Sequence, residues 1–353
     1  KTMAPLNIAV IGAGGTGMAM AADLTLKGHH VTIFEQPGYH QETTADLLAD
    51  STIELTGNAA VGTAHIHRFT QDITEVLEGA ELVLVSAVAN RHQELAQLMA
   101  PYLCDGQTVC FSSGNCASLR LAPLLGGKKV LVGELQGNIY PCRKIGPRKV
   151  LIAMPAAVKN AAAFPGKDTP AFLASLGRVY PCQAVKNIFE ATLNSPNLVI
   201  HLAGSLLNAA RMESMDDFRL YRDGLTPSVF RLIEAMEVEK KAVMDGMGYT
   251  AIPAVDFLRM LGQPQLQLFR DLDGPTSTNH RYITEDAYAG VSLLASLAAP
   301  TGTFTPVAQA LISIASALNG MDYAAQGLSL RTLGLENLDA TRINQYLESG
   351  HAE

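Results

Sequence analysis

The sequence predicts an α/β fold in which a doubly wound parallel sheet is followed by a second, mostly α-helical domain. Three observations support this prediction. Short β-rich runs alternate with helical segments from Leu6 to about Arg143, and a cluster of glycines follows the first run. After about Asn187, segments with a 3.6-residue period take over. Because 353 residues suffice for two cores, we expect domains at residues 1–187 and 188–353.

Five apolar runs are expected to be strands of the N-terminal sheet. The segments between them have the period of crossover helices, which is typical of βαβ units. Two later runs, residues 149–156 and 178–185, are expected to extend the same sheet before the pattern changes. The five runs are residues 8–11, 31–34, 81–88, 108–113 and 130–135.

A glycine motif follows the first of these strands. Gly12, Gly14 and Gly17 form a G-x-G-x-x-G between a predicted strand and a predicted helix, which is the context of a Rossmann-type dinucleotide-binding loop. The first glycine allows a tight turn, the second lets a pyrophosphate approach the backbone, and the third lets the helix pack on the strand. We therefore expect cofactor binding by the loop that contains Gly12, Ala13, Gly14, Gly15 and Gly17.

The residue that follows the second predicted strand indicates which cofactor is bound. Glu35 lies about 20 residues after the glycine motif, where a carboxylate accepts hydrogen bonds from the ribose hydroxyls of NAD. It would repel the 2′-phosphate of NADP, and residues 36–39 contain no arginine. NAD is therefore expected rather than NADP. Ser86 and residues 112–115, at later strand ends, are expected to line the nicotinamide side. The alternative is a glycine-rich turn with Glu35 as a solvated charge.

Composition and charge narrow the class of protein. The formal net charge of −7 argues against nucleic acid or an anionic membrane as the main partner. We expect a cytoplasmic protein, because no signal peptide opens the chain and no apolar run is long enough to span a bilayer. The five cysteines form no CxxC pair, so we expect no metal site and interpret them as small buried hydrophobic residues.

The helical half contains candidate catalytic residues. In SPNLVIHLAGSLLN, Ser195 is expected to cap a helix that begins at Pro196, which places His201 about two turns inside it. Asn197 and Asn208 are expected on the same face as His201, and Asn197 is a candidate for substrate binding. The alternative is a hydrogen-bonded core histidine without a catalytic role.

A second charged segment, NHRYITEDAYAG, lies between apolar helices. Thr284 is expected to cap the helix that follows, so Asp286 near its N-terminus should stay ionised and raise the pKa of a histidine. Arg281 is suited to bind a carboxylate through two parallel hydrogen bonds. The alternative is a solvated charged loop.

Several stretches together resemble the octopine/nopaline (opine) dehydrogenase family. The resemblance covers nearly the whole chain in order, and its specific part is the pair of C-terminal motifs. Ala287 and Tyr288 depart from the Pro-Tyr-Gly-like turn that is common in the family. The stretches are the glycine loop, ELQGNIYPCR, SPNLVIHLAGSLLNAARME, FRLYRDGLTPSVFRLIEAMEVEKKAV and RYITEDAYAGVSLLASLA.

The resemblance implies an oxidoreductase that acts on a CH–NH bond in amino acid metabolism. An amino acid and a 2-oxo acid, such as pyruvate or 2-oxoglutarate, would form an imine that NAD(P)H reduces to a secondary-amine dicarboxylate. It implies that His201 and Asp286 form a catalytic dyad and that Arg281 binds the substrate carboxylate. Arg143, after a predicted strand end, is a second candidate anion site, with a helix cap or a pair with Glu134 as alternatives.

Other functions remain open at this point. A 2-oxo-acid or ketopantoate-type reductase shares the architecture, but by family resemblance it relies on a lysine, and the SPNLVIH helix has none. A redox-sensing NAD-binding protein would leave the dyad idle. The sequence does not identify the substrates, the working direction or the oligomeric state, for which a homodimer is one candidate. Tyr221 and Arg222 are interpreted either as contacts to the amino acid or as a surface turn.

Overall fold

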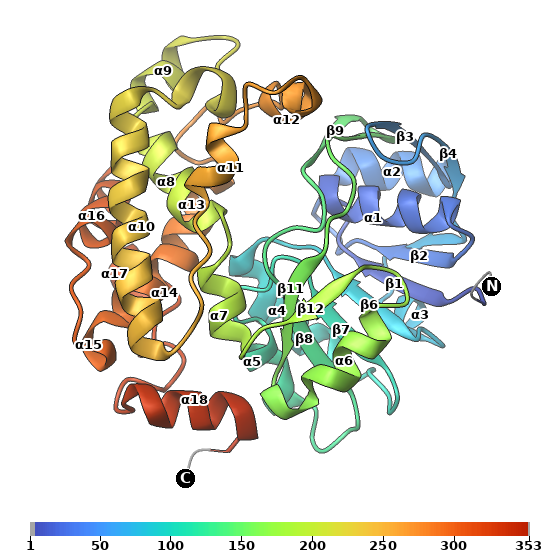
Figure 1. The fold of residues 1–353 in the computed structure, drawn as a ribbon. Coiled ribbons are helices and arrows are strands. Elements are labelled where there is room, and N and C mark those ends of the chain that lie inside the picture. Colours follow the sequence, from blue (N-terminus) through green and yellow to red (C-terminus); the bar gives the residue numbers. More distant parts are fainter. Residues whose placement is uncertain (1–3, 352–353) are drawn as a thin grey trace. The chain divides into compact units, whose positions relative to one another are not determined.

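The computed structural model describes residues 4–351 and divides into two compact units, whose elements are labelled in Figure 1. Unit 1 comprises the described residues up to Ala87 together with Arg91–Ile188. Unit 2 comprises Val88–Asn90 and the described residues from Phe189 onward. The short segment Val88–Asn90 therefore lies between two stretches of unit 1 in the sequence but belongs to unit 2 in the structure.

Unit 1 contains the sheet that carries the glycine loop. In the described part of the chain it has eight strands in the order β12-β11-β8-β7-β6-β1-β2-β5. The five strands expected from sequence, β1, β2, β6, β7 and β8, are confirmed. From β5 to β8 all neighbours are parallel, which gives the doubly wound order with its reversal between β1 and β6. The bounds are β1 (Asn7–Ile11), β2 (His30–Phe34), β5 (Arg68–Thr70), β6 (Leu82–Val85), β7 (Thr108–Phe111), β8 (Leu131–Leu135), β11 (Lys159–Ala163) and β12 (Cys182–Ala184).

The expected fold class, a doubly wound parallel sheet followed by a helical domain, is confirmed, and two strands at one edge of the sheet run opposite to the central ones. Strand β11 pairs antiparallel with β8, and β12 pairs parallel with β11. The run at residues 178–185 thus extends the sheet as expected, but in the opposite direction to the central strands. The chain between β8 and β11 contains two strands and no crossover helix, so nothing forces it to return in a parallel direction.

A second, four-stranded sheet was not expected. It has the order β4-β3-β10-β9, with β3 (Thr52–Gly57), β4 (Gly62–His65), β9 (Cys142–Gly146) and β10 (Lys149–Ile152). The expectation that residues 149–156 extend the main sheet was wrong, because β10 pairs with β3 and β9 instead. This sheet packs against helix α1 (Gly15–Leu26), in which residues 17–24 are buried on every side. A helix so enclosed lacks the polar face of a surface helix.

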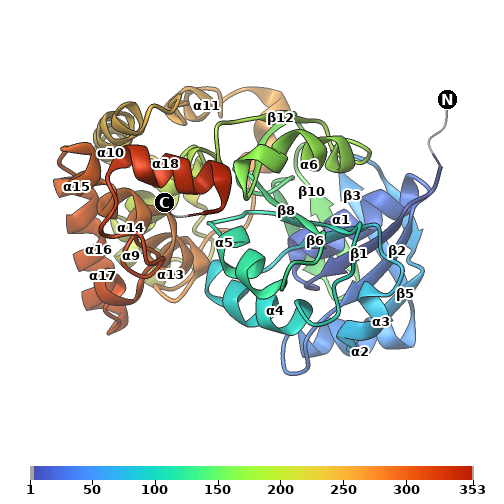
Figure 2. The ribbon, with the colours of Figure 1, turned by 90° about the horizontal axis from the view of Figure 1, so that it is seen from below.

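Alternate residues of the central strands face two different cores. On β1, Ile8 and Val10 pack with α1, whereas Ala9 and Ile11 pack on the opposite face with residues of α3, α4 and α5. Figure 2 shows α3 and α4 on one side of the sheet and α6 on the other. The remaining helices of unit 1 are α2 (Gln41–Ala49), α3 (Ile73–Leu77), α4 (His92–Met99), α5 (Ser118–Leu121) and α6 (Thr169–Leu176).

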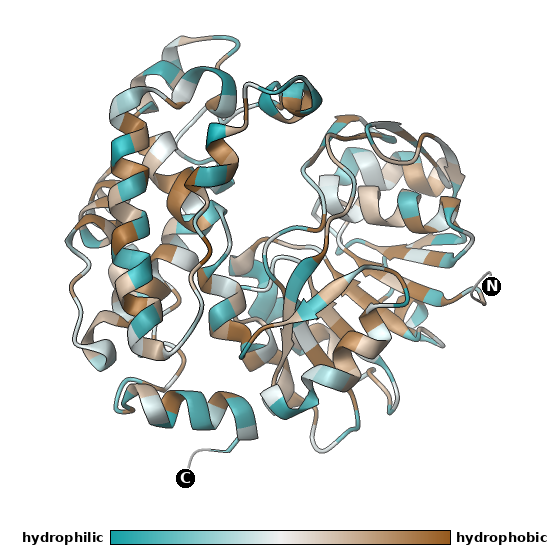
Figure 3. Ribbon diagram, viewed as in Figure 1, coloured by the Kyte–Doolittle hydropathy of each residue, from teal (hydrophilic) through white to brown (hydrophobic). Residues whose placement is uncertain are grey.

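Unit 2 is helical and is built around α8, in which every residue from Leu198 to Leu206 is buried. Helix α8 contacts α10, α13, α14 and α16. Figure 3 shows hydrophobic and hydrophilic residues alternating along α10, as expected for a helix with one buried face. The bounds are α7 (Ile188–Leu193), α8 (Asn197–Leu206), α9 (Ala209–Ser214), the π-helical turn η4 (Leu220–Gly224), α10 (Pro227–Met247), α11 (Val255–Arg259), α12 (Gln267–Arg270), α13 (Arg281–Tyr288), α14 (Gly290–Ser296), α15 (Ala298–Thr301), α16 (Pro306–Asn319), α17 (Tyr323–Gln326) and α18 (Ala340–Ser349).

The segment that carries His201 differs from its expected form in two respects. The helix is assigned from Asn197, one residue later than expected, and Ser195 does not cap it. It ends at Leu206, so Asn208 lies beyond α8 and precedes α9 instead of sharing the face of His201. His201 is consequently little more than one turn inside α8. The Asn208 side chain donates to the carbonyl oxygens of Gly204 and Gly224, which stabilises the break.

None of the five cysteines, all of which lie within residues 4–351, forms a disulfide bond. Cys110, Cys116 and Cys142 are buried as expected, whereas Cys104 is exposed and Cys182 is half-buried. In the stretch from residue 4 to 351, no helix is both long and apolar enough to cross a bilayer.

A buried carboxyl group holds the loop that follows β7. Glu134, on β8, accepts hydrogen bonds from the backbone N–H groups of Cys116 (2.8 Å) and Ser118 (3.2 Å) and from the Ser118 hydroxyl. Within this loop Asn115 and Cys116 adopt φ angles of 46° and 63°, which residues other than glycine rarely adopt. Burial raises the pKa of Glu134 to about 7, and the hydrogen bonds that the carboxylate accepts oppose this rise.

This raised pKa predicts a pH-dependent stability. Since the folded-state pKa of Glu134 (about 7) exceeds its ordinary value of 4.5, the folded state binds more protons between these pH values. The contribution of Glu134 is full below pH 4.5 and is lost as the pH rises to about 7. Glu134→Gln cannot ionise, so its unfolding free energy should lack this decline, on the order of 3 kcal/mol.

Urea denaturation of wild type and Glu134→Gln across this pH range measures the difference. Glu54→Gln, at a half-exposed carboxylate paired with Lys149, is the matched control and should keep the wild-type slope. Identical slopes for all three proteins would show that Glu134 does not titrate in this range.

Candidate active site

The glycine loop lies where the winding of the sheet reverses. Gly12 directly follows β1 and has a φ angle of 110°. A Cβ atom at this position would lie 2.2 Å from the carbonyl oxygen of Ser86, the residue that follows β6. Because β1 and β6 are parallel neighbours, the loops beyond their carboxyl ends meet. The structure thus brings Ser86 to the glycine loop, and both the backbone angle and the contact require glycine at position 12.

The start of α1 has the form of an anion-binding helix terminus. Gly14 precedes the helix, Gly15 is its first residue, and no side chain caps the N-terminus. A Cβ atom at Gly17 would lie 1.9 Å from the carbonyl oxygen of Gly12, so only glycine lets α1 pack this closely on the loop. The uncapped N–H groups and the bare backbone fit a pyrophosphate.

Glu35 is almost fully buried immediately after β2. Its Oε2 atom accepts a hydrogen bond from the Ala13 N–H (2.7 Å), and its Oε1 atom accepts one from the Gln36 N–H (2.9 Å). Glu35 therefore holds the glycine loop through the Ala13 N–H. A carboxylate has about four lone-pair positions, so these two bonds leave acceptor capacity for ribose hydroxyls.

Arg91 lies beside Glu35, which the sequence analysis did not anticipate. Its Nη1 atom is 3.5 Å from Glu35 Oε1, its Nη2 atom donates to Gln36 Oε1 (3.1 Å), and its guanidinium stacks on the Tyr39 ring at 3.5 Å. Arg91 is distant from residues 36–39 in the sequence, but it follows β6, which lies on the other side of β1 from β2. The topological neighbourhood of β1 was the signal that could have identified it.

Arg143 lies in β9, which belongs to unit 1. Its Nη1 atom donates to the carbonyl oxygen of Cys142 (2.9 Å), and its backbone lies 3.9 Å from the position of a Cβ at Gly15. The structure thus places Arg143 beside the first turn of α1. Glu134 uses its carboxylate to bind the loop at residues 116–118.

The structure brings His201 and Asp286 together, although 85 positions separate them. The Nδ1 atom of His201, on α8, is 3.0 Å from Oδ2 of Asp286, on α13. The Nε2 atom of His201 is 3.0 Å from the hydroxyl oxygen of Tyr221, and the Tyr282 ring stacks on the imidazole with centroids 3.6 Å apart. The histidine side chain is only 4% exposed. With Asp286 ionised, Nδ1–H donates to the carboxylate and Nε2 accepts from Tyr221.

Asp286 does not lie near a helix N-terminus, which corrects the sequence expectation. Helix α13 begins at Arg281, where the His280 side chain caps it by accepting from the Tyr282 N–H, so Thr284 is inside the helix. Asp286 is therefore beyond the first turn and gains little from the helix dipole. Burial raises its pKa well above the ordinary value, although the Arg281 charge opposes this. Burial therefore favours the neutral carboxyl group, so the expectation that a helix N-terminus keeps Asp286 ionised is not supported.

Two further charged side chains lie on α13. The Nη1 atom of Arg281 is 3.9 Å from Oε2 of Glu285, and its side chain is 36% exposed. Glu285 accepts a hydrogen bond from the Ala89 N–H (3.0 Å) within unit 2. Burial raises the pKa of Glu285 to about 7, the Asp286 charge adds to this, and Arg281 opposes it. Asn197 is half-buried on α8, four residues before His201 and therefore on the same face.

Tyr221 belongs to the site, although sequence left its role open. It is buried within the π-helical turn η4, and its ring packs on Phe269 with centroids 4.5 Å apart. Arg222 points instead to Asp217 and Asp223 and forms ion pairs with both. Among residues 4–351, no group of three or more His, Cys, Asp or Glu side chains is placed to hold a metal ion.

Two protein-family models match the two halves of the chain. The model described as "Ketopantoate reductase PanE/ApbA" matches residues 8–135, and that described as "NAD/NADP octopine/nopaline dehydrogenase, alpha-helical domain" matches residues 184–319. Together with the dinucleotide loop and the buried His–Asp pair, these matches define an NAD(P)-dependent oxidoreductase.

Full-length relatives specify the family. An opine dehydrogenase of Arthrobacter sp. (strain 1C) is 30% identical over 358 positions, which cover 96% of this chain and 98% of the relative. The protein ocs of Agrobacterium vitis is 20% identical, with the same coverage of both chains. The chain therefore belongs to the opine dehydrogenase family.

Solved structures share the fold over the full length. Octopine dehydrogenase in complex with NADH and pyruvate superimposes with a TM-score of 0.71 at 19% identity, covering 98% of both chains. Yersinopine dehydrogenase with bound NADP⁺ superimposes with a TM-score of 0.65 at 17% identity, covering 98% of both chains. Since one structure holds NADH and the other NADP⁺, the fold is compatible with either cofactor.

The contact of Gly17 with Gly12 predicts the effect of a single methyl group. Gly17→Ala should lower the affinity for NADH at least about tenfold, because α1 must move away from the loop whose N–H groups are expected to receive the pyrophosphate. Fluorescence titration with NADH measures the dissociation constant. Gly262→Ala is the control, because a Cβ there meets nothing within 4 Å, and it should bind as wild type does. Equal affinities for all three proteins would refute the close approach.

Proposed function

We propose that this protein catalyses the NADH-dependent reductive condensation of an amino acid with a 2-oxo acid, either pyruvate or 2-oxoglutarate, to a secondary-amine dicarboxylate. The observation that carries the proposal is the hydrogen bond between buried His201 and Asp286, whose side chain is 12% exposed. Membership of the opine dehydrogenase family supports it. Structures of octopine dehydrogenase with NADH and pyruvate, and with NADH and L-arginine, show that fold with an oxo acid and with an amino acid.

His201 manages the protons of the condensation. The amine adds to the oxo acid as its ammonium proton is removed, and the resulting carbinolamine loses water when a proton returns to its oxygen. An imidazole held by a carboxylate can store the proton between the two transfers, because Asp286 fixes the proton on Nδ1 and stabilises the imidazolium. The nicotinamide cofactor, when bound, supplies the hydride that reduces the imine carbon.

Charged and polar side chains orient the substrates. Arg281 is one-third exposed and lies on the same helix as Asp286, so it is proposed to bind the oxo-acid carboxylate through two parallel hydrogen bonds. Asn197, on the His201 face of α8, is proposed to contact substrate. Arg143 lies beside the first turn of α1, which supports a role as an anion-binding group near the cofactor pyrophosphate.

A plain 2-oxo-acid reductase is the second candidate function. The ketopantoate reductase model matches residues 8–135, which supports it for unit 1. The proton donor of unit 2 favours the opine reaction, because α8 carries His201 and contains no lysine. The two functions differ in one requirement, since only the condensation consumes an amine.

The position of Glu35 predicts a preference for NADH over NADPH. Its buried carboxylate would face the 2′-phosphate at a like-charge and desolvation cost on the order of one to a few kcal/mol, and Arg91 is already engaged by Glu35, Gln36 and Tyr39. Glu35→Gln keeps an acceptor for the Ala13 N–H and should narrow the preference. Steady-state kcat/KM values with both cofactors test this. Equal wild-type values would refute the assignment of NAD.

Amine dependence and the dyad test the function itself. Wild-type NADH oxidation with pyruvate or 2-oxoglutarate should require an added amino acid and yield a secondary amine detectable by mass. His201→Ala and Asp286→Ala should each lower kcat on the order of 10² or more with NADH binding intact, because proton transfer supplies that much. The double variant should lose little beyond the worse single variant.

The same experiment has two outcomes that count against the proposal. Amine-independent formation of a 2-hydroxy acid would favour the reductase instead. Near-normal activity of His201→Ala, or strictly additive losses of kcat in the double variant, would indicate that His201 is a hydrogen-bonded core histidine without a catalytic role.

A further inference from the structure

We propose that the Tyr221 hydroxyl carries the proton between His201 Nε2 and the substrate, so that the tyrosine and not the imidazole touches the reacting atoms. This inference rests on the proposed condensation and deepens it. It assigns a catalytic role to a residue that the family motifs quoted above leave without one.

The contacts of His201 point to this role. Its Nδ1 atom is bound to Asp286, and its Nε2 atom is bound to the Tyr221 hydroxyl, each at 3.0 Å. One ring face is covered by Tyr282. Both nitrogens are therefore engaged within the protein, and a proton that leaves Nε2 along its hydrogen bond arrives at the tyrosine oxygen. Tyr221 is 9% exposed and His201 is 3% exposed, so the tyrosine is the less enclosed of the two.

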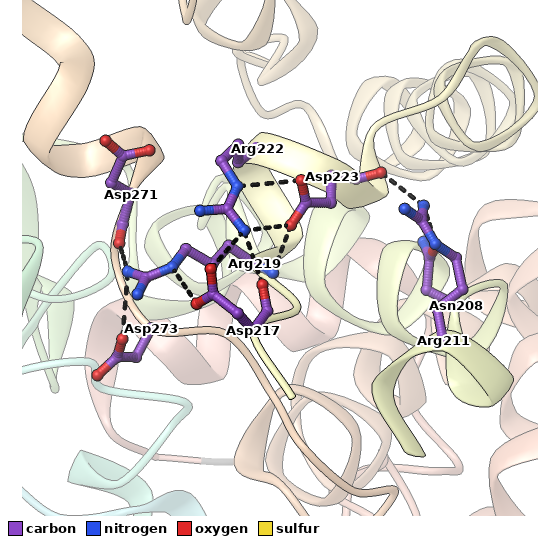
Figure 4. Close-up of polar contacts among 8 residues, drawn as sticks. All are labelled: Asn208, Arg211, Asp217, Arg219, Arg222, Asp223, Asp271 and Asp273. Atoms are coloured by element: carbon purple, nitrogen blue, oxygen red, sulfur yellow. Dashed lines mark hydrogen bonds and ion pairs between the residues drawn. The ribbon is translucent and has the colours of Figure 1, made fainter. Parts of the chain in front are cut away.

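An ion-pair network supports the turn that carries Tyr221 (Figure 4). Arg222 bridges the carboxylates of Asp217 (3.0 Å) and Asp223 (2.9 Å), and the Asp223 carboxylate also accepts from the Arg219 N–H (2.9 Å). Arg219 in turn pairs with Asp273 (3.2 Å), which ties the turn to the chain segment after α12. Turns of this kind are rare and are frequently found at functional sites.

The turn is also tied to the helix that carries His201. Asn208 donates to the carbonyl oxygens of Gly204 on α8 (2.8 Å) and of Gly224 at the end of η4 (3.0 Å). A Cβ atom at either glycine would lie 2.9 Å from Cδ1 of Leu220. Tyr221 and His201 are thus positioned by one locally packed structure.

The transfer balances in both directions. When the amine adds, the C–N bond forms and the carbonyl π bond breaks. One proton of the ammonium group moves to the carbonyl oxygen, and a second passes to the Tyr221 oxygen while the tyrosine proton passes to Nε2, which gives an imidazolium. When water leaves, Nε2–H returns its proton to Tyr221, and the tyrosine proton goes to the carbinolamine hydroxyl. The C–O bond breaks, and the nitrogen lone pair forms the C=N bond of a protonated imine, which keeps the third proton of the ammonium group. Tyr221 ends each step neutral, so no strongly basic phenolate accumulates.

Single-turnover NADH oxidation by Tyr221→Phe tests the relay. The variant keeps the ring that packs on Phe269 and removes only the hydroxyl. We expect its rate to fall on the order of 10², with the NADH dissociation constant unchanged, because a proton-transfer group is lost. Tyr102→Phe, at a 48% exposed tyrosine, is the matched control and should react at the wild-type rate. A Tyr221→Phe rate within about threefold of wild type would overturn the proposal, since it would show that substrate displaces the tyrosine.

The ion-pair support gives a second, independent variant. Arg222→Gln should lower the single-turnover rate about tenfold by loosening the turn, and the Tyr221→Phe/Arg222→Gln double variant should react no more slowly than Tyr221→Phe. Arg259→Gln is the control, because Arg259 also bridges two carboxylates, Asp256 and Glu234, and it should leave the rate unchanged. If the losses in single-turnover rate add in the double variant, the ion-pair network does not act by positioning Tyr221.

Failure of the relay can be distinguished from failure of the proposed function. The product of the wild-type enzyme, a secondary amine or a 2-hydroxy acid, decides the function. Solvent mixtures of H₂O and D₂O decide the relay for either product, because carbonyl reduction also needs a proton. The relay moves two protons in one step, one between substrate and Tyr221 and one between Tyr221 and His201. The wild-type rate should therefore depend on the deuterium fraction along a curve, and a linear dependence would contradict the relay.

Discussion

The hydrogen bond between His201 and Asp286 is the interaction on which unit 2 depends. It joins α8 and α13 in a core where every residue of α8 from Leu198 to Leu206 is buried. An imidazole and a carboxyl group in such a place must satisfy each other, because burying either without a partner costs several kcal/mol. The same pairing fixes the tautomer of the histidine and leaves Nε2 directed at Tyr221, so the packing of the core and the chemistry of the site share one constraint.

In unit 1 the comparable constraint is that backbone segments approach each other too closely for any side chain to lie between them. Gly12 accommodates the carbonyl oxygen of Ser86, and Gly17 accommodates that of Gly12, at distances where any side chain would clash. These contacts exist because β1 and β6 are parallel neighbours at the reversal of the sheet. Glu35 adds a hydrogen bond to the same loop, so the carboxylate proposed to select the cofactor also shapes the backbone that receives it.

Sequence alone predicted the features that arise from local pattern. The five central strands and the spacing of the glycines have signatures within a few residues, and the buried, paired His201 and Asp286 occupy positions that family motifs mark. Features that arise from distant packing were missed. Arg91 reaches Glu35 through the order of the strands, and β10 joins the four-stranded sheet through β3, nearly 100 residues earlier in the chain. The expectation that Thr284 caps α13 was wrong, because the cap is His280, whose ring nitrogen accepts a hydrogen bond from the Tyr282 N–H as a hydroxyl oxygen would.

The location of the proton on His201 tests the central claim most directly. Nuclear magnetic resonance of protein labelled with ¹⁵N-histidine, with His201→Gln used to assign the signal, reports which ring nitrogen carries hydrogen. The account predicts a neutral ring protonated at Nδ1, with Nε2 accepting from Tyr221, and loss of this tautomer in Asp286→Asn. Protonation at Nε2 alone, unchanged in Asp286→Asn, would contradict it, because Asp286 would then not orient the histidine.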